Sequence, residues 1–195
     1  MQRPRQTLVA NCEACARVTW WNRELGVPVN ALSPTEQAAR LARVRLLCLD
    51  VDGVLTDGKL YWAGEGLWSQ RFCVRDGYGI KLLQELGIEI AVLSGGDVRS
   101  GRDRCASLGI RRAHFGVVDK VAAFRDVAGA LGLGFEDAAF IGDELVDMPL
   151  LELVSFAATV PDAVDEVKAV VHHVTRRPGG DGAVRELCDL IRAHR

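Results

Sequence analysis

The chain has 195 residues, of which 49% are hydrophobic and 26% are charged, and its formal net charge is −2. This length suits one globular domain with a short extension, and the mixed charges exclude the basic surface typical of nucleic-acid-binding proteins. No apolar run approaches the ~20 residues of a transmembrane helix, and no basic amphipathic helix indicates a membrane surface. The stretch "TLVA" is far shorter than the ~7–15 apolar residues of a signal peptide. We therefore expect a cytoplasmic protein with no nucleic-acid and no membrane partner.

Residues 1–32 show no sustained periodicity, and we interpret them as an N-terminal extension of unknown role. They contain the pair Cys12 and Cys15, in "CEAC". A zinc site needs a second such pair or nearby histidines, and neither is close in the sequence. Whether this pair binds anything therefore stays open at this point.

The predicted domain spans residues 33–195 and begins with a short helix. Ser33 is a good N-cap, Pro34 suits the first helical position and Glu36 completes a capping box. An apolar strand, "RLLCLDV", follows. The segments 60–64 and 67–74 then predict a β-hairpin around "EG". Because this hairpin carries aromatic side chains, we expect a subunit interface to cover it.

Helices and short apolar strands alternate through the rest of the chain. Strands are predicted over 88–94, 113–115, 138–142, 156–160 and 172–175. Helices are predicted over 76–86, 97–109, 119–132, 145–153, 161–170 and 182–194. This alternation predicts an α/β, Rossmann-like parallel sheet with helices on both faces.

Polar side chains follow three of the predicted strands. Ligands of open α/β sheets bind beyond the carboxyl ends of the strands, so these groups are expected to converge. The set consists of Asp50 and Asp52 after the first strand, Ser94 and Gly95 after the next, Lys120 at a helix start, and Asp143, Glu144 and Asp147 after a later strand. Each has a structural alternative as a turn, a helix cap or a solvated side chain, but their joint placement favours a site.

This set suits phosphoryl transfer. Carboxylate oxygens are ligands for Mg²⁺, and a lysine with free backbone amides can neutralise a phosphate group. One carboxylate can attack phosphorus while a second donates and then accepts the proton. Residues i and i+2 of a strand point the same way, so Asp50 and Asp52 can address one phosphate.

At these residues the sequence resembles the haloacid dehalogenase superfamily of phosphohydrolases. "DVDGVLTDG" is similar to its first motif, Ser94 to its second, Lys120 to its third and "GDELVD" to its fourth. The stretches "VRDGYGIKLL", "DRCASLGI", "VTRRPGG" and "GAVRELCDLI" resemble the 3-deoxy-D-manno-octulosonate 8-phosphate phosphatase family in particular. This resemblance runs from about residue 35 to the C-terminus. It implies a capless domain with a β-hairpin flap after the first strand, the cofactor Mg²⁺ and a homotetramer in which neighbours help to close each site.

The resemblance also implies residue roles. Asp50 would be the nucleophile, Asp52 the general acid and base, and Ser94 and Lys120 the phosphate-holding groups. Asp50, Asp143 and the main-chain carbonyl of Asp52 would hold the metal. The substrate contacts would be Cys73, Val74, Arg75, Asp76, Gly77, Lys81, Gly95, Arg104 and Glu144.

Four positions depart from the pattern of that family. Gly96 and Asp181 stand where arginines are usual, Cys73 replaces an asparagine, and Glu144 replaces an aspartate. Neither glycine nor aspartate can reproduce the bidentate grip of arginine on a carboxylate. The implied function is hydrolysis of 3-deoxy-D-manno-octulosonate 8-phosphate in lipopolysaccharide sugar synthesis. A related phosphate, such as a nonulosonate 9-phosphate, is the alternative substrate.

Two other classes of protein compete with a phosphatase. A non-catalytic regulatory or assembly domain linked to sugar-nucleotide synthesis would be expected to have lost Asp50, Asp52 or Asp143, and all three are present. A phosphoacceptor receiver domain also places acids on a parallel sheet, but it lacks the D-x-D spacing and would form a long-lived aspartyl phosphate. The paired aspartates therefore favour a hydrolase.

Overall fold

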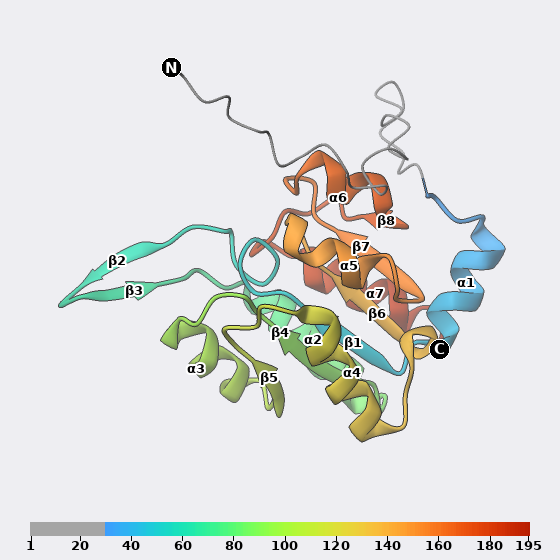
Figure 1. Ribbon diagram of the computed structural model, residues 1–195, viewed down its shortest axis with the longest axis horizontal. Coiled ribbons are helices and arrows are strands. Elements are labelled where there is room, and N and C mark those ends of the chain that lie inside the picture. The colour runs from blue at the N-terminus through green and yellow to red at the C-terminus, as the bar shows by residue number, and fades with distance from the viewer. Residues whose placement is uncertain (1–29) are drawn as a thin grey trace, which may run out of the picture.

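A six-stranded parallel sheet runs through the computed structural model, which describes residues 30–195. The strand order is β5-β4-β1-β6-β7-β8, and every neighbouring pair is parallel (Figure 1). The strands are β1 (Leu46–Leu49), β4 (Glu89–Leu93), β5 (Arg112–His114), β6 (Ala138–Ile141), β7 (Phe156–Thr159) and β8 (His173–Val174). The predicted fold class is confirmed. Cys12 and Cys15, with most of the proposed extension 1–32, lie outside the described residues.

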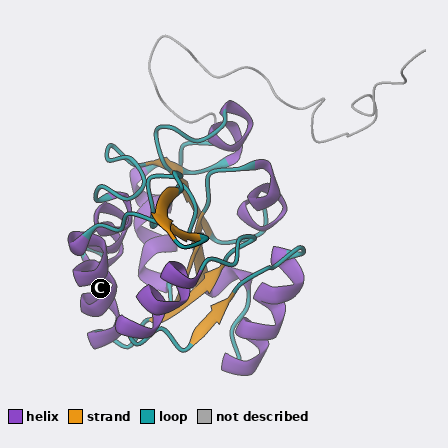
Figure 2. Cartoon of the chain, turned by 90° about the vertical axis from the view of Figure 1, so that its left-hand side faces the viewer, coloured by secondary structure: helices purple, strands orange, loops and turns teal. Residues whose placement is uncertain are grey.

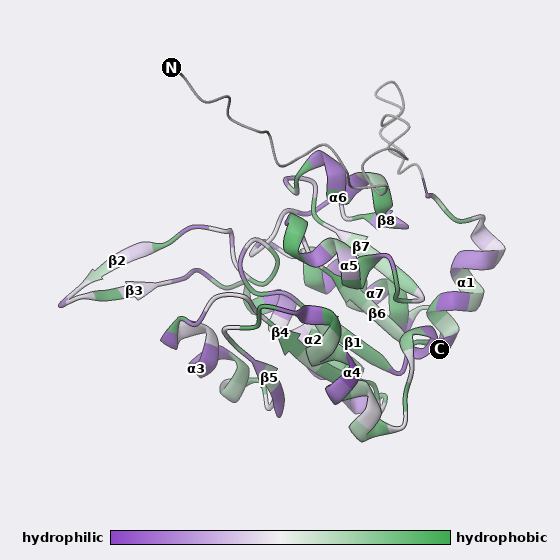
Figure 3. Ribbon diagram, in the orientation of Figure 1, coloured by the Kyte–Doolittle hydropathy of each residue, from purple (hydrophilic) through white to green (hydrophobic). Residues whose placement is uncertain are grey.

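Helices cover both faces of this sheet (Figure 2). They are α1 (Pro34–Arg43), α2 (Val74–Glu85), α3 (Arg99–Ser107), α4 (Lys120–Leu131), α5 (Met148–Leu151), α6 (Asp165–Val170) and α7 (Ala183–Arg192). Helices α1 and α2 both contact α7, whereas α4 contacts α5. Every residue of β1, β6 and β7 is buried, as expected for parallel strands with both faces covered. Figure 3 shows these strands as a hydrophobic centre between helices of mixed polarity.

The predicted capping box of α1 is present. The Ser33 hydroxyl accepts a hydrogen bond from the backbone of Glu36 at 3.3 Å, and the Glu36 carboxylate accepts one from the backbone of Ser33 at 3.0 Å. These two bonds satisfy backbone donors that a helix N-terminus otherwise leaves unpaired. The helix therefore begins where the sequence predicts.

The segment predicted as one helix over 145–153 is divided in the structure. It forms a 3₁₀ turn, η3 (Leu145–Asp147), followed by the single-turn helix α5, and a second 3₁₀ turn, η2 (Phe135–Asp137), precedes β6. The side chain of Asp147 accepts hydrogen bonds from the backbone of Asp143 and Glu144. This folds the chain tightly after β6. The helix predicted over 161–170 is also shorter, because α6 begins only at Asp165.

The hairpin of β2 (Tyr61–Gly64) and β3 (Leu67–Ser69) extends away from the sheet (Figure 1). Its two turn residues, Glu65 and Gly66, both have positive φ, as tight hairpin turns require. The rings of Trp62 and Trp68 meet edge to face, with centroids 5.1 Å apart. Both indoles are more than half exposed in the single chain, so the hairpin presents an apolar surface.

The described helices do not include a membrane span. None of those between residues 30 and 195 combines the length and the apolar character needed to cross a bilayer.

Candidate active site

Asp50 directly follows β1 and is 6% exposed. Its backbone donates a hydrogen bond to the carbonyl of Ile141, which extends the pairing of β1 with β6 by one residue. Its Oδ1 accepts a hydrogen bond from the backbone of Val51 at 2.7 Å and lies 3.0 Å from Nζ of Lys120. Among residues 30–195, no hydrogen bond engages the other oxygen, Oδ2. The carboxylate is thus held by one oxygen, and the second is available to a ligand.

Lys120 is the first residue of α4, and its side chain is buried between two carboxylates. Its Nζ lies 3.0 Å from Asp50 and 2.6 Å from Oδ1 of Asp147. Burial alone would lower the pKa of Lys120, but these carboxylates raise it by more, so its pKa is raised overall. The lysine is therefore a permanent cation at the carboxyl ends of β1 and β6.

Asp147 organises the loop after β6. Its Oδ1 accepts from Lys120, while its Oδ2 accepts from the backbone of Asp143 at 3.0 Å and of Glu144 at 3.1 Å. It is fully buried. Both of its oxygens are engaged within the protein, so we assign it to positioning Lys120 and the Asp143 loop. The sequence placed Asp147 among the strand-end acids but did not indicate this role.

Asp50, Asp143 and Asp147 form a crowded group, with one carboxylate oxygen of each lying within 4.8 Å of the others. Burial, together with the charge of Asp147, raises the pKa of Asp50 to about 7 against the opposing effect of Lys120. Burial and the charges of Asp50 and Asp147 raise the pKa of Asp143 to about 8. Three acids thus share one lysine, which leaves an excess of negative charge.

This excess fits a divalent cation. Oδ1 of Asp143 is buried and has no hydrogen-bond partner among the described residues, and Oδ2 of Asp50 is unengaged as well. Carboxylate oxygens of this kind are the ligands that Mg²⁺ prefers. The two predicted carboxylate ligands, Asp50 and Asp143, are therefore placed together. The side chain of Asp52 is not part of this group, and its role through the main-chain carbonyl stays a prediction.

Ser94 follows β4 and is buried at the same edge of the sheet. Its hydroxyl donates to the carbonyl of Gly96 at 3.1 Å, and its own carbonyl accepts from the backbone of Val117 at 2.9 Å. Gly95, the next residue, is exposed. The loop therefore presents a hydroxyl beside an accessible main chain, as a phosphate site requires.

The carboxylate of Asp52 contacts a residue that the sequence did not indicate. Its Oδ1 accepts a hydrogen bond of 2.6 Å from the side-chain amide of Gln70, which lies at the base of the hairpin. A Cβ atom added to Gly96 would lie only 2.6 Å from the other oxygen of Asp52. The carboxylate thus occupies the space that any side chain at position 96 would need.

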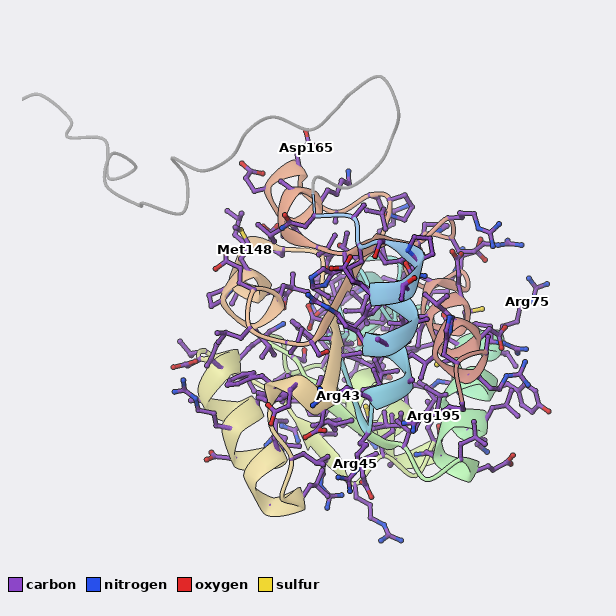
Figure 4. The ribbon with its side chains drawn as sticks, turned by 90° about the vertical axis from the view of Figure 1, so that its right-hand side faces the viewer. Arg43, Arg45, Arg75, Met148, Asp165 and Arg195 are labelled. Carbon is purple, nitrogen blue, oxygen red and sulfur yellow. The ribbon has the colours of Figure 1, made fainter. Side chains whose placement is uncertain are left out.

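The predicted substrate-contact residues at α2, at α3 and in the loop after β6 lie apart from the acidic side chains around Lys120. At the start of α2, the Arg104 guanidinium donates to the carbonyl of Cys73 at 3.2 Å and packs against Gly77. Val74, Arg75 and Lys81 are exposed, and Figure 4 shows Arg75 pointing away from the body of the molecule. The side chain of Glu144 caps η3 by accepting from the backbone of Leu145 at 2.7 Å. None of these side chains joins the carboxylates around Lys120.

Asp76 lies apart from this group, on the buried side of α2. Its Oδ1 accepts a hydrogen bond of 2.7 Å from the backbone of Arg185, in the first turn of α7. Burial raises its pKa to about 6, against the backbone hydrogen bonds of α7. In this chain Asp76 joins α2 to α7.

The glycines of the C-terminal loop allow it to pack onto the loop after β1. The backbone of Gly180 donates to the carbonyl of Val54 at 3.0 Å, and its φ is +64°. A Cβ atom on Gly179 would collide with the carbonyl of Gly53. Asp181 is exposed at the end of this loop. Residues separated by more than 120 positions therefore share the rim of the site, which explains the sequence "PGG".

A surface cavity of about 490 Å³ lies beside α7. Its lining includes Arg75, Arg176, Arg177 and Arg185, together with three acidic side chains, and none of the acids around Lys120. Glu186 and Asp189 pair with two of these arginines. The cavity therefore adjoins the C-terminal loop at the rim of the site, and its charges are largely neutralised within the chain.

Comparison with known proteins agrees with this geometry. The family model for haloacid dehalogenase-like hydrolases matches residues 115–187. The 3-deoxy-D-manno-octulosonate 8-phosphate phosphatase of Escherichia coli K12 is 42% identical over 153 residues, which cover 78% of this chain and 81% of the relative.

Two solved structures are also similar. The corresponding phosphatase of Yersinia pestis is 40% identical, covers 82% of this chain and 86% of its own, and gives a TM-score of 0.79. The phosphatase of Moraxella catarrhalis, in complex with a magnesium ion, a phosphate ion and a KDO molecule, is 32% identical over 84% of this chain and 94% of its own, with a TM-score of 0.81. The chain belongs to the 3-deoxy-D-manno-octulosonate 8-phosphate phosphatase family of haloacid dehalogenase-like hydrolases.

Proposed function

We propose that this chain is a Mg²⁺-dependent phosphatase that converts 3-deoxy-D-manno-octulosonate 8-phosphate into 3-deoxy-D-manno-octulosonate and inorganic phosphate. The observation that carries this proposal is the convergence of Asp50, Lys120 and Asp143 at one edge of the sheet. Membership of the family supports the substrate. Burying these charges lowers the stability of the fold, so we would not expect a regulatory domain without catalysis to keep them.

The reaction follows from the two aspartates. Oδ2 of Asp50 attacks phosphorus, and the bond to the sugar oxygen breaks as Asp52 gives that oxygen a proton, which leaves an aspartyl phosphate on Asp50. Asp52, now ionised, takes a proton from a water molecule that attacks the same phosphorus. The bond to Asp50 breaks, inorganic phosphate leaves, and both side chains return to their starting states.

The surrounding groups bind and orient the phosphate. Asp50, Asp143 and the main-chain carbonyl of Asp52 would hold Mg²⁺, which supplies positive charge for the phosphate oxygens in the transition state. Ser94 would donate its hydroxyl, Gly95 its backbone amide and Lys120 its charge to the same oxygens. Lys120 also favours the ionised form of Asp50 and orients its carboxylate, since it lies 3.0 Å from its Oδ1.

A second candidate substrate is a related sugar acid phosphate, such as a nonulosonate 9-phosphate. The observation that favours it is the loss of two family arginines, at Gly96 and Asp181. Because glycine has no side chain, no cation from position 96 reaches the substrate carboxylate. A sugar whose carboxylate lies elsewhere would not need those arginines.

We further infer a homotetramer in the cytoplasm, in which the exposed hairpin packs on a neighbouring subunit. Trp62 and Trp68 give it an apolar surface that a partner would cover. Replacing Trp62 by Asp should lower the mass measured by light scattering, whereas Leu153→Asp, at another exposed apolar side chain, should leave it unchanged. An unchanged mass for Trp62→Asp would exclude the hairpin from the interface.

The decisive experiment is phosphate release from a panel of sugar phosphates, with Mg²⁺ and with a chelator. The panel must include both the octulosonate and the nonulosonate phosphates. Mg²⁺-dependent turnover that is best on the octulosonate phosphate supports the first substrate, and a clear preference for another member supports a change in specificity. Absence of turnover on every member, by a chain that is folded and metal-loaded, would favour the regulatory alternative.

A further inference from the structure

The side chain of Gln70 links Asp52 to helix α3. Its amide nitrogen donates to Oδ1 of Asp52 at 2.6 Å, and its amide oxygen accepts from the hydroxyl of Ser100 at 2.9 Å. Both polar ends of one side chain are therefore engaged. The three groups come from separate elements, namely the loop after β1, the base of the hairpin and the first turn of α3.

Hydrogen-bond chemistry fixes the direction of this chain of contacts. An ionised carboxylate only accepts hydrogen bonds, so the NH₂ group of Gln70 faces Asp52 in that state. When Asp52 carries the proton that it gives to the sugar oxygen, this proton lies on Oδ2, and Oδ1 still accepts from Gln70. The amide oxygen then faces Ser100, whose hydroxyl can donate to it. Asp52 thus sets the direction of the amide, and the hydrogen bond from Ser100 holds its other end in place.

The opposite side of the Asp52 carboxylate is bounded by Gly96. A Cβ atom at this position would lie 2.6 Å from Oδ2 of Asp52, closer than a carboxylate can tolerate. On one side, the carboxylate therefore accepts a hydrogen bond from Gln70. On the other side, it occupies space that a side chain at position 96 would need. Gly96, which departs from the family pattern, and Gln70 together define one orientation of Asp52.

We propose that Gln70, held by Ser100, is a positioning residue for the proton-transferring carboxylate of Asp52. It touches neither the phosphate-binding groups nor the acids around Lys120 among the described contacts, and it acts only through Asp52. This inference rests on the proposed phosphatase reaction, because it concerns the step in which Asp52 protonates the departing sugar oxygen. General acid catalysis depends on such geometry, since the proton must be within hydrogen-bond reach of the leaving oxygen.

The test uses two leaving groups. A sugar alkoxide is a poor leaving group that needs the proton of Asp52, whereas the 4-nitrophenolate of 4-nitrophenyl phosphate departs without it. The ratio kcat/KM includes only the steps up to departure of the leaving group, so hydrolysis of the aspartyl phosphate does not enter it. A misplaced Asp52 therefore lowers kcat/KM for the sugar phosphate and spares the aryl phosphate.

Gln70→Ala should lower kcat/KM for the best sugar phosphate by about 10- to 100-fold, and that for 4-nitrophenyl phosphate by less than about threefold. Ser100→Ala should show the same selectivity with a smaller loss, and Ser100→Thr, which keeps the hydroxyl, should recover most of it. Ser69→Ala is the matched control, because among residues 30–195 this neighbouring hydroxyl bonds only to the carbonyl of Tyr61 within the hairpin. Its two ratios should stay unchanged.

A double-mutant cycle adds a second readout. In the Asp52→Asn background, Gln70→Ala should cause no further loss on the sugar phosphate, since residues that act as a unit are not additive. Equal losses of kcat/KM on both substrates, or full additivity of Gln70→Ala with Asp52→Asn, would mean that Gln70 has a merely structural role. Either result would overturn the inference and leave the proposed phosphatase function standing. A faster Gln70→Ala enzyme would also overturn it, because Gln70 would then hold Asp52 in an unproductive orientation. If the unaltered chain hydrolyses neither substrate, the proposed function itself is wrong and this inference falls with it.

Discussion

Asp50 and Asp76 are both buried carboxylates, and burial raises their pKa values to about 7 and about 6, yet their surroundings differ. Asp50 shares a single lysine with Asp143 and Asp147, so its group carries more negative than positive charge. Asp76 stands at the N-terminus of α7, whose backbone donates to it. A helix N-terminus itself favours an acidic side chain.

This difference separates a chemical site from an architectural one. Each place contains a buried carboxylate oxygen without a partner among the described residues, on Asp143 and on Asp76 respectively. A raised pKa or an unpaired oxygen therefore does not identify a functional site. What distinguishes the group around Lys120 is that three acids share one lysine, so a bound cation or added protons must offset their charge.

The largest expected effect comes from Asp50→Asn. This substitution keeps the shape of the side chain but removes the nucleophile, so kcat should fall by about 10⁴-fold or more. Phosphate release on the best sugar phosphate measures the loss. Thermal unfolding serves as the control and should show a folded protein, since the change removes one of three crowded acids. Unchanged turnover would contradict the assignment of Asp50.

Removing the lysine should unbalance the charged group. Lys120→Met leaves Asp50 and Asp147 buried without their cation, and breaking a buried pair in this way costs about 3–5 kcal/mol of unfolding free energy. Urea unfolding in the presence of a chelator measures this cost. Saturating Mg²⁺ should restore part of it, because a cation replaces the missing charge. If the unfolding free energy fell by less than about 1 kcal/mol, Asp50 and Asp147 would not both be ionised in the folded chain.

Metal binding should distinguish the two carboxylate sites directly. Mg²⁺ at about 100 times its dissociation constant should stabilise the unaltered chain by about 2.7 kcal/mol. Asp143→Asn should abolish most of this gain, whereas Asp76→Asn should keep it. Calorimetric melting with Mg²⁺ and with a chelator provides the measurement. A lost response in Asp76→Asn would mean that the two sites are coupled through the fold.

A further expected effect is the pH dependence that Asp76 contributes. Its pKa is raised from 3.8 in the unfolded chain to about 6 in the folded one, so the folded state holds the proton to higher pH. Between pH 3.8 and about 6 the unfolded state binds fewer protons, and stability therefore falls as pH rises through this window. Asp76→Asn should remove this contribution. Its stability relative to the unaltered chain should rise across the window, as followed by urea unfolding. If the difference in unfolding free energy between the two proteins stayed constant across the window, the pKa of Asp76 would not be raised in the folded chain.

Several features of the site could be predicted because they follow from local patterns. The apolar strand before Asp50, the helix that begins at Lys120 and the strand before Asp143 are each visible within about ten residues of sequence. Parallel strands of an α/β sheet place their carboxyl ends at one edge, so convergence of these residues could be inferred without coordinates. The capping box of α1 was predicted for the same reason, since its partners lie three residues apart.

The interpretation of 145–153 as one helix was wrong for a physical reason. The apolar periodicity there is real, but the side chain of Asp147 accepts from the backbone of Asp143 and Glu144, just before the turn, and so caps a short 3₁₀ turn ahead of α5. Its other oxygen is taken by Lys120, which lies 27 residues earlier. Nothing in the local sequence distinguishes this use of Asp147 from a helix N-terminal acid.

By itself, the sequence determined the fold class, the aspartate pair at the end of β1 and the family of metal-assisted phosphatases, because each depends on short patterns of residues. Only the tertiary structure decided that Asp76 joins α2 to α7, that the Gly179 loop covers the loop after β1, and that Gln70 reaches Asp52. These contacts join residues 18 to more than 100 positions apart. Their partners are set by how helices and loops pack on the finished sheet, which no local pattern encodes.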